Sequence, residues 1–355
     1  MVKEVCLNYD RDKNIDTIKG IAIFLVVWGH LIQYSGANRF DFYNDNIFKI
    51  IYSFHMPLFM IISGYLFYFS FKKRSWIDLM KNKIKTILKT IVIWNIIRYL
   101  ILSAVEYMLE GKFSFSVIEM IRQMKGLWFL WAVLICSILV GTIGRCRSNI
   151  MEEILLICCM PVIKLLPNEK YVIFVYPFFV LGYLFNKYRN NISDEVIKLR
   201  FLTLLIFPVM WFFYEKKHYI YVSGIDIFNS VYGVWGQIEI NIFRWIIGLV
   251  GSICVITIVQ LIFRNKKKYT TSIITKLGTI SLQVYVIQSI LIEEVYKRVY
   301  LSLCNYYDYN VLLGNIIVYD LVITLILTFI FLLVINFLIK LIRKSCIVNN
   351  VLFGR

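Results

Sequence analysis

The chain of 355 residues is 59% hydrophobic, 17% aromatic and only 17% charged. A typical soluble domain is about half apolar and about a quarter charged. The composition therefore excludes a disordered chain, a collagen and a disulfide-stapled secreted domain, and it indicates an integral membrane protein. Only 5 prolines and 17 glycines interrupt the apolar runs. Such long runs favour spanning helices over the short alternating strands of a membrane barrel.

Ten apolar segments are each expected to cross the membrane as a helix, because about 20 apolar residues span a bilayer. In chain order they are 17–36, 47–70, 86–108, 127–144, 150–166, 171–187, 199–214, 242–263, 278–298 and 314–338. The fifth to the seventh are short and are bounded or interrupted by prolines. No hydrophilic stretch is long enough for a separate soluble domain. We therefore predict an all-α integral membrane protein in which residues 1–355 form a single domain.

The placement of Lys and Arg predicts how these spans are oriented. If the N-terminus is cytoplasmic, the cytoplasmic connections carry the whole formal net charge of +17. Both chain ends are then expected in the cytoplasm, as ten spans require. Because topology already explains the basic residues, no nucleic-acid partner is expected. The first apolar run follows basic residues, as a signal peptide does, but it is long enough to span and nine more spans follow it.

Two of the three histidines, His30 and His55, lie inside apolar segments, whereas His218 lies in a connection where we expect it to be solvated. Ionisable residues within a membrane are costly, so they are candidates for function. The span directions place both imidazoles roughly 10 Å below the outer surface. Consecutive spans are usually neighbours, so the two rings are expected to face one cavity. The alternative is that each ring only satisfies a backbone carbonyl.

Lys19 precedes His30 by 11 residues. At about 100° and 1.5 Å per residue, both side chains lie on one helix face, about 16 Å apart along the axis. Lys19 would then mark the cytoplasmic rim of a groove that holds His30, although a lysine at a helix end also snorkels to the membrane surface without any further role. A cation about three turns from a buried histidine suits an extended anionic substrate such as acyl-coenzyme A.

The chemistry expected at His30 is general-base catalysis of direct acyl transfer, because a buried neutral imidazole accepts protons near neutral pH. A serine or cysteine acyl-enzyme is not indicated, since the chain has no Gly-x-Ser-x-Gly elbow and no Cys beside a His. The eight cysteines show no metal-ligand spacing, so no metal is expected.

Further candidates lie in the second to fourth predicted spans and the basic segment 72–89. Lys83 and Lys85 in that segment are candidates for docking coenzyme A phosphates, or they serve only topology and anionic lipid. Arg98 lies within a span, where a bare charge costs about 3 kcal/mol or more, so it needs a partner or a water-filled cavity. Tyr65 and Trp128 are candidates for stacking on sugar or adenine, or they are packing and interface aromatics.

Two sequence blocks resemble the acyltransferase-3 family of membrane O-acyltransferases, and within it the fucose 4-O-acetylase-like branch. The first is RDKNIDTIKGIAIFLVVWGH at 11–30, and the second is FHMPLF at 54–59 followed by SGY at 63–65. Weaker similarity continues in order at 127–130, 177–183 and 277–288.

This resemblance implies about ten spans, acetyl-CoA or a related donor, and a glycan hydroxyl as the acceptor. It implies that His30 is the catalytic histidine and that Lys19 stands in the place of the family's basic partner, which is usually Arg. Lys cannot make the bidentate fork of Arg to a phosphate. Gln288 stands where many members have His.

Taken together, the sequence predicts an O-acetyltransferase of the bacterial cytoplasmic membrane, with acetyl-CoA as donor and a cell-surface or lipid-linked glycan as acceptor. His30 is expected to deprotonate the sugar hydroxyl, and His55 to orient His30, hold the acceptor or stabilise the oxyanion. One alternative is a transporter, flippase or polymerase of envelope polysaccharide, which would favour interrupted half-helices or internal repeats. Another is a different membrane acyltransferase with a lipid or protein acceptor.

Overall fold

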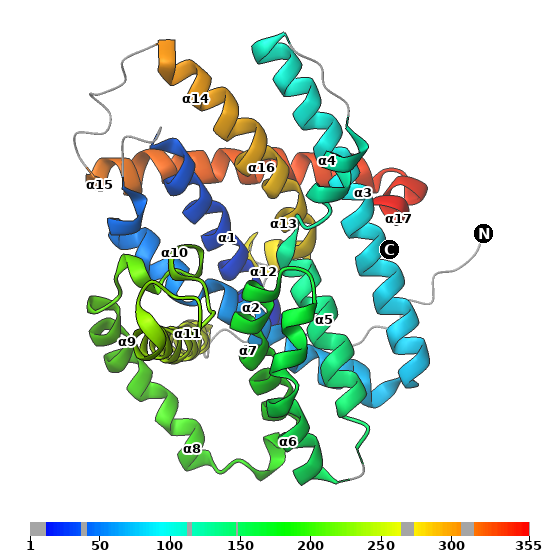
Figure 1. The fold of residues 1–355 in the computed structure, drawn as a ribbon, viewed down its shortest axis with the longest axis vertical. Coiled ribbons are helices and arrows are strands. Elements are labelled where there is room, and N and C mark those ends of the chain that lie inside the picture. Colours follow the sequence, from blue (N-terminus) through cyan, green and yellow to red (C-terminus); the bar gives the residue numbers. More distant parts are fainter. Residues whose placement is uncertain are drawn as a thin grey trace.

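The computed structural model describes residues 12–36, 41–111, 116–146, 148–263, 273–306 and 316–354. Within these ranges every regular element is helical (Figure 1). The longer helices are α1 (Lys13–Ser35), α2 (Asn46–Lys73), α3 (Trp76–Glu110), α5 (Trp128–Ile143), α7 (Glu169–Lys187), α11 (Gly233–Phe263) and α16 (Leu325–Arg343). The prediction of an all-α chain is confirmed for the part that the structure describes.

Shorter helical pieces connect or extend these helices. The short α-helices are α4 (Val117–Gln123), α6 (Asn149–Cys158), α8 (Asp194–Lys198), α9 (Thr203–Phe212), α10 (Ile220–Ser223), α12 (Ile273–Thr279), α13 (Ser281–Ile290), α14 (Lys297–Tyr306), α15 (Ile316–Val318) and α17 (Cys346–Phe353). The 3₁₀ turns are η1 (Phe42–Asn44), η2 (Met160–Leu165), η3 (Arg189–Asn191), η4 (Leu199–Leu202) and η5 (Lys216–His218). Two π-helical turns, η6 (Leu291–Tyr296) and η7 (Tyr319–Thr324), complete the set.

Polar caps mark where the apolar helices begin. Asp12 accepts hydrogen bonds from the N–H groups of Asn14 and Ile15 at the start of α1, at 2.9 and 3.4 Å. Asp45 accepts from the N–H of Phe48 at 2.6 Å at the start of α2. Each cap satisfies N–H groups that the first turn of a helix leaves without a partner.

Five helices are long and apolar enough to cross a membrane: α1, α2, α3, α11 and the continuous helix Tyr319–Arg343. Two bent pairs, α4 with α5 and α12 with α13, raise the number to as many as seven. Every one of the ten predicted segments coincides with helical structure, but ten spans are not confirmed. The fifth and seventh segments each combine a 3₁₀ turn with a helix of only 10 residues.

Helices α1 and α2 lie at the centre of the molecule, with α3 and α5 on one side and α9 and α11 on the other (Figure 1). Glycines allow the closest approaches. Gly64 of α2 lies against the carbonyl of Phe179 in α7, and Gly182 of α7 lies against the carbonyl of Ile61. A Cβ atom at either glycine would overlap the backbone of the facing helix, so small residues fix this packing as they do in other membrane helices.

The short helix α12 is held against α1 in the same way. Gly20 of α1 meets the carbonyl of Ile274, and Gly278 of α12 meets the carbonyl of Asp16. The chain then turns by 79° between α12 and the helix that begins at Ser281. This bend places the start of α13 beside the first half of α1.

Candidate active site

A polar cavity of about 320 Å³ contains both predicted histidines. We call it the histidine cavity. Its lining residues are Val26, His30, Gln33, Tyr34, Tyr43, Tyr52, His55, Met56, Arg98, Gly126, Leu127, Trp128, Tyr221, Tyr285, Ser289 and Glu293. Four residues proposed from sequence, His30, His55, Arg98 and Trp128, therefore meet at one place although they come from α1, α2, α3 and α5.

His30 has a polar partner at each ring nitrogen. Its Nε2 lies 3.4 Å from Oε1 of Glu293, and its Nδ1 lies 3.3 Å from the hydroxyl of Tyr52. The Tyr52 hydroxyl is also 3.3 Å from Oε1 of Gln33. Tyr34 stacks on the imidazole with its ring centroid 5.9 Å away. A ring held on both edges and one face has a fixed orientation, which general-base catalysis requires.

Glu293 reaches His30 from the π-helical turn η6, close in space although far along the chain. Oε1 of Glu293 also accepts a hydrogen bond from Nε2 of Gln288 at 3.0 Å. The adjacent Glu294 forms an ion pair with Arg98, and its other oxygen lies 3.7 Å from Arg298. Single π turns often occur at functional sites. Here the turn supplies carboxylates to His30 and to Arg98 from neighbouring positions.

His55 is buried, with 4% of its surface exposed, and its Nδ1 lies 2.8 Å from the backbone carbonyl of Ile51. In the neutral ring, Nδ1–H donates to this carbonyl, so Nε2 is left as a hydrogen-bond acceptor. Tyr52 lies between the two histidines, 4.7 Å from His55 and 6.2 Å from His30 between ring centroids. His55 thus satisfies a carbonyl of its own helix and also lines the cavity.

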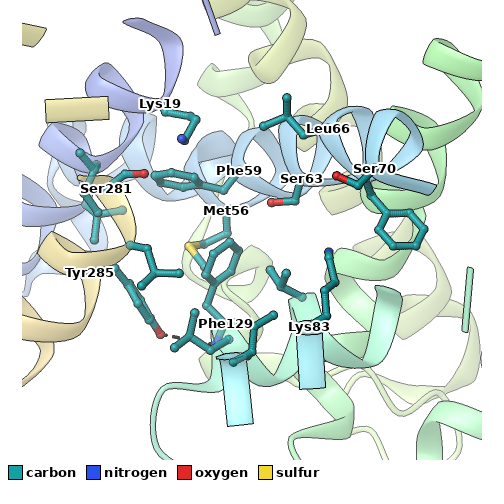
Figure 2. A pocket seen from close by; sticks show the side chains of 17 residues that line it. Lys19, Met56, Phe59, Ser63, Leu66, Ser70, Lys83, Phe129, Ser281 and Tyr285 are labelled. Atoms are coloured by element: carbon teal, nitrogen blue, oxygen red, sulfur yellow. Dashed lines mark hydrogen bonds between the residues drawn. The ribbon is translucent and has the colours of Figure 1, made fainter. Parts of the chain in front are cut away.

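A second cavity of about 250 Å³, which we call the lysine cavity, is shown in Figure 2. Its lining residues are Lys19, Ile23, Val26, Met56, Phe59, Ser63, Leu66, Phe67, Ser70, Lys83, Ile87, Phe129, Leu130, Val133, Ser281, Leu282 and Tyr285. Lys19 and Lys83 approach it from opposite sides (Figure 2). Lys83 donates to the hydroxyl of Ser137 at 2.8 Å, and Lys19 lies 3.6 Å from the carboxylate of Asp16.

The two cavities share part of their wall. Val26, Met56 and Tyr285 line both of them. The hydroxyl of Tyr285 accepts a hydrogen bond from the N–H of Phe129 at 3.4 Å, which fixes one side of this shared wall (Figure 2). The two cavities therefore adjoin at these side chains.

Two residues proposed from sequence do not join either cavity. Tyr65 lines neither cavity. Its hydroxyl accepts a hydrogen bond from Arg189 at 3.0 Å, and its ring packs on Phe69 and Phe185. Lys85 is exposed on α3. Residues two positions apart on a helix lie about 200° apart around the axis, so Lys85 cannot share the face that brings Lys83 to the cavity.

The expectation of a solvated His218 is wrong. The side chain is buried, with 6% of the residue exposed, and its Nδ1 accepts a hydrogen bond from the N–H of Glu215 at 2.8 Å. Burial lowers the pKa of His218 to about 4. Its carbonyl accepts from Nε of the buried Arg244 at 2.8 Å, so the connection after α9 is anchored to α11.

Several lining residues escaped the sequence analysis, notably Glu293, Tyr52 and Tyr285. The available signal for Glu293 was the pair of carboxylates within the predicted span 278–298, because charges are rare in spans. Nothing in the sequence distinguishes Tyr52 and Tyr285 from the other tyrosines of the chain, which has 24. Within the described ranges, no three His, Cys, Asp or Glu side chains are grouped as metal ligands would be.

Comparison with known proteins places these features in a family context. A family model described as "Acyltransferase domain" matches residues 12–342. The chain is 32% identical over 204 residues to Nodulation protein NolL of Sinorhizobium fredii, a match that covers 56% of this chain and 54% of that protein. It is 33% identical over 183 residues to Nodulation protein NolL of Mesorhizobium japonicum, covering 50% and 48%. The chain thus matches about half the length of these relatives, and no solved structure matches it significantly.

Proposed function

The chain belongs to the acyltransferase-3 family, and on this premise we propose that it is a membrane O-acetyltransferase that moves an acetyl group from acetyl-CoA to a glycan hydroxyl. The observation that carries the proposal is the pair of adjoining cavities, one lined by Lys19 and Lys83 and the other built around His30 and Glu293. Placement in the fucose 4-O-acetylase-like branch is part of the proposal.

The donor occupies the lysine cavity. Lys19 and Lys83 offer positive charge to the phosphorylated part of acetyl-CoA, and the mainly apolar wall between them suits its thin arm. Lys19 and His30 lie about 16 Å apart along α1. An extended pantetheine arm is of comparable length, so the thioester reaches the wall formed by Val26, Met56 and Tyr285.

The transfer uses His30 as the general base. Glu293 holds the proton on Nε2, and the sugar hydroxyl displaces the Tyr52 hydroxyl from Nδ1. Nδ1 then accepts the proton of the sugar hydroxyl as its oxygen attacks the thioester carbonyl. The carboxylate also stabilises the imidazolium that forms. When the tetrahedral intermediate collapses, the carbon–sulfur bond breaks and His30 returns the proton to the departing thiolate. The products are the acetylated glycan and coenzyme A.

The other polar groups of the histidine cavity serve the acceptor and the developing charge. The acceptor nitrogen of His55 takes a hydrogen bond from a second sugar hydroxyl. Of the three roles expected from sequence, His55 therefore holds the acceptor, and it neither orients His30 nor stabilises the oxyanion. Arg98, whose Nε has no hydrogen-bond partner among the described residues, supplies positive charge to the oxyanion. Trp128 and the tyrosines present aromatic faces to sugar rings.

The protein lies in the bacterial cytoplasmic membrane with ten spans and both ends inside. The lysine cavity then faces the cytoplasm, where acetyl-CoA is found, and the histidine cavity lies toward the outer surface. In a cysteine-free background, Asn44→Cys should react with an impermeant thiol reagent added outside, whereas Lys72→Cys should not. The reverse labelling would contradict this orientation.

Broken helices do not distinguish an acetyltransferase from a polysaccharide transporter or flippase, because this chain itself has a break of 79° between α12 and α13. The separating experiment is acetyl transfer. Glycans from cells with and without the gene are compared by mass spectrometry, and the purified protein is supplied with labelled acetyl-CoA and those glycans. We expect gene-dependent O-acetyl groups and glycan-dependent release of coenzyme A. Glycans of equal acetylation, with altered amount or chain length, would support transport or polymerisation instead.

A further inference from the structure

A third polar feature lies at the break between α12 and α13. The pocket there has a volume of about 50 Å³ and shares Lys19, Ser281 and Leu282 with the lysine cavity. Thr279 and Gln283 also line it. The pocket is therefore a polar annex at the Lys19 side of the larger apolar space, and apart from Lys19 none of its residues has been given a role above.

The backbone at this break leaves N–H groups without helical partners beside the annex. The first hydrogen bond of α13 runs from the N–H of Val284 to the carbonyl of Ile280 at 3.0 Å, and no side chain caps the N–H groups before it. The start of a helix carries partial positive charge and unsatisfied donors, so it favours an anion. Ser281 and Leu282 are the first two residues of this helix and line the pocket.

The side chain of Ser281 is a second, independent indication. Ser281 is 93% buried, at 7% exposure, and it lines both the annex and the lysine cavity. Among the described residues its hydroxyl has no hydrogen-bond partner. Because this side chain lines two cavities, a ligand at this position would give the hydroxyl a hydrogen-bond partner.

Positive side chains stand around the same place. Lys19 and Ser281 lie on the same side of the lysine cavity, across from Lys83 (Figure 2). Arg343 donates to Oε1 of Gln283 at 2.7 Å, which brings a further cation behind the annex wall. Asp16, 3.6 Å from Lys19, offsets part of this charge. The glycine contacts between α12 and α1 hold the start of α13 beside Lys19.

We propose that the start of α13, with the Ser281 hydroxyl and Lys19, binds the phosphate group from which the pantetheine arm of the donor begins. The inference rests on the proposed use of an acyl-CoA donor and assigns one of its phosphates to a particular site. The annex lies at the Lys19 end of the lysine cavity, and Lys19 is about 16 Å from His30 along α1, which is comparable to the pantetheine arm. Lys83 is left for the remaining phosphates of the head group.

The test uses the full chain in nanodiscs of uncharged lipid with three donors: acetyl-CoA, acetyl-phosphopantetheine and acetyl-pantetheine, which lacks phosphate. The quantity of interest is the ratio of kcat/KM for acetyl-phosphopantetheine to that for acetyl-pantetheine. We expect Ser281→Ala to lower this ratio about tenfold, because hydrogen bonds to charged groups are the stronger ones. Ser281→Thr keeps the hydroxyl and should retain most of the preference.

A matched control is Ser252→Ala, which removes a buried hydroxyl of α11 that bonds the carbonyl of Gly248 and lines neither cavity. It should leave the ratio unchanged. An unchanged ratio in Ser281→Ala, or an equal loss with both donors, would overturn the phosphate site while leaving the acetyltransferase intact. If the wild type transfers acetyl from none of the donors, the proposed function fails, and calorimetric binding of phosphopantetheine to wild type and Ser281→Ala still tests the site.

Lipid head groups also carry phosphate, and a further experiment distinguishes a lipid phosphate from the donor phosphate. Thermal stability is compared in nanodiscs with and without phosphatidylglycerol. If the site binds the donor, phosphatidylglycerol should change the thermal stability of the wild type and of Ser281→Ala equally. A stabilisation by phosphatidylglycerol that is lost in Ser281→Ala, with the donor ratio unchanged, would assign the site to lipid and overturn the proposal.

Discussion

The histidine cavity and the lysine cavity are neighbours of similar size, at about 320 and 250 Å³, but they are built from different chemistry. The first gathers two histidines, an arginine, a carboxylate and several tyrosines. The second is lined mainly by apolar side chains, with Lys19 and Lys83 at its two sides. A polar, fixed cavity suits reacting groups, whereas an apolar one with cations at its edges suits an extended anionic ligand.

The shared helix α1 explains how one fold supplies both. Lys19 lies on one cavity, His30 lies on the other, and Val26 between them lines both. The difference between the cavities therefore predicts different kinetic effects. Changes in the histidine cavity should lower kcat, and changes in the lysine cavity should raise KM for the donor.

The largest effect is expected at His30. His30→Ala should lower acetyl transfer by at least about 10²–10⁴-fold, because it removes the base. The protein should still reach the membrane in normal amount, since the ring packs mainly against Tyr34 and a cavity. The measurement is specific activity per mole of detergent-purified protein. Normal specific activity with reduced abundance would mean that His30 is structural. His55→Ala should be damaging but leave measurable turnover.

Glu293→Gln tests the partner of His30. The change removes the carboxylate charge but keeps the size and the hydrogen-bonding capacity of the side chain. We expect kcat to fall about 10²-fold with little change in donor KM, because the imidazolium loses its stabilising charge. Glu239→Gln, at an exposed position of α11, is the matched control and should have no effect. A rise in donor KM alone would move Glu293 from the reaction to donor binding.

Lys19 and Lys85 separate the cavity from the surface. Lys19→Ala should raise the KM for acetyl-CoA about tenfold and change kcat little, whereas Lys19→Arg should retain activity because the charge is kept. Lys85→Ala should be silent, since Lys85 is exposed and lines neither cavity. The measurement is kcat and KM for each variant, from steady-state kinetics with varied acetyl-CoA concentration. Equal effects at both positions would favour a general surface attraction over a defined site.

The smallest effect concerns the connection that covers the histidine cavity through Tyr221. The pKa of His218 falls from its ordinary 6.5 to about 4 because the ring is buried. The unfolded chain therefore binds this proton below pH 6.5 and the folded protein does so only near pH 4, so stability is lost as the pH falls through that window. Hydrogen exchange in 213–232 should speed up between pH 7 and 5, after correction for intrinsic rates. His218→Gln should lack this change, and an identical pH response in the variant would contradict the assignment.

The predicted spans were sufficient to place His30 and His55 in one cavity. The sequence gives the position of each histidine along its span, and consecutive spans are usually neighbours. It was not sufficient for the spans themselves. The 79° bend after α12 and the 3₁₀ turns near Pro161 depend on packing that hydropathy does not record. Glu293 was missed for a similar reason, since the π turn changes which residues of that helix point inward. Lys85 was chosen by charge alone, although its helical position already separates it from Lys83.

The central claim is that the acyl donor extends from the lysine cavity to the histidine cavity. It is tested most directly with a coenzyme A thioester that carries a small diazirine on its acyl group. After photolysis of the full chain in nanodiscs, peptide mass spectrometry should find adducts at Met56, Trp128 or Tyr285, and excess coenzyme A should suppress them. Adducts confined to surface residues, or adducts that coenzyme A does not suppress, would contradict the account.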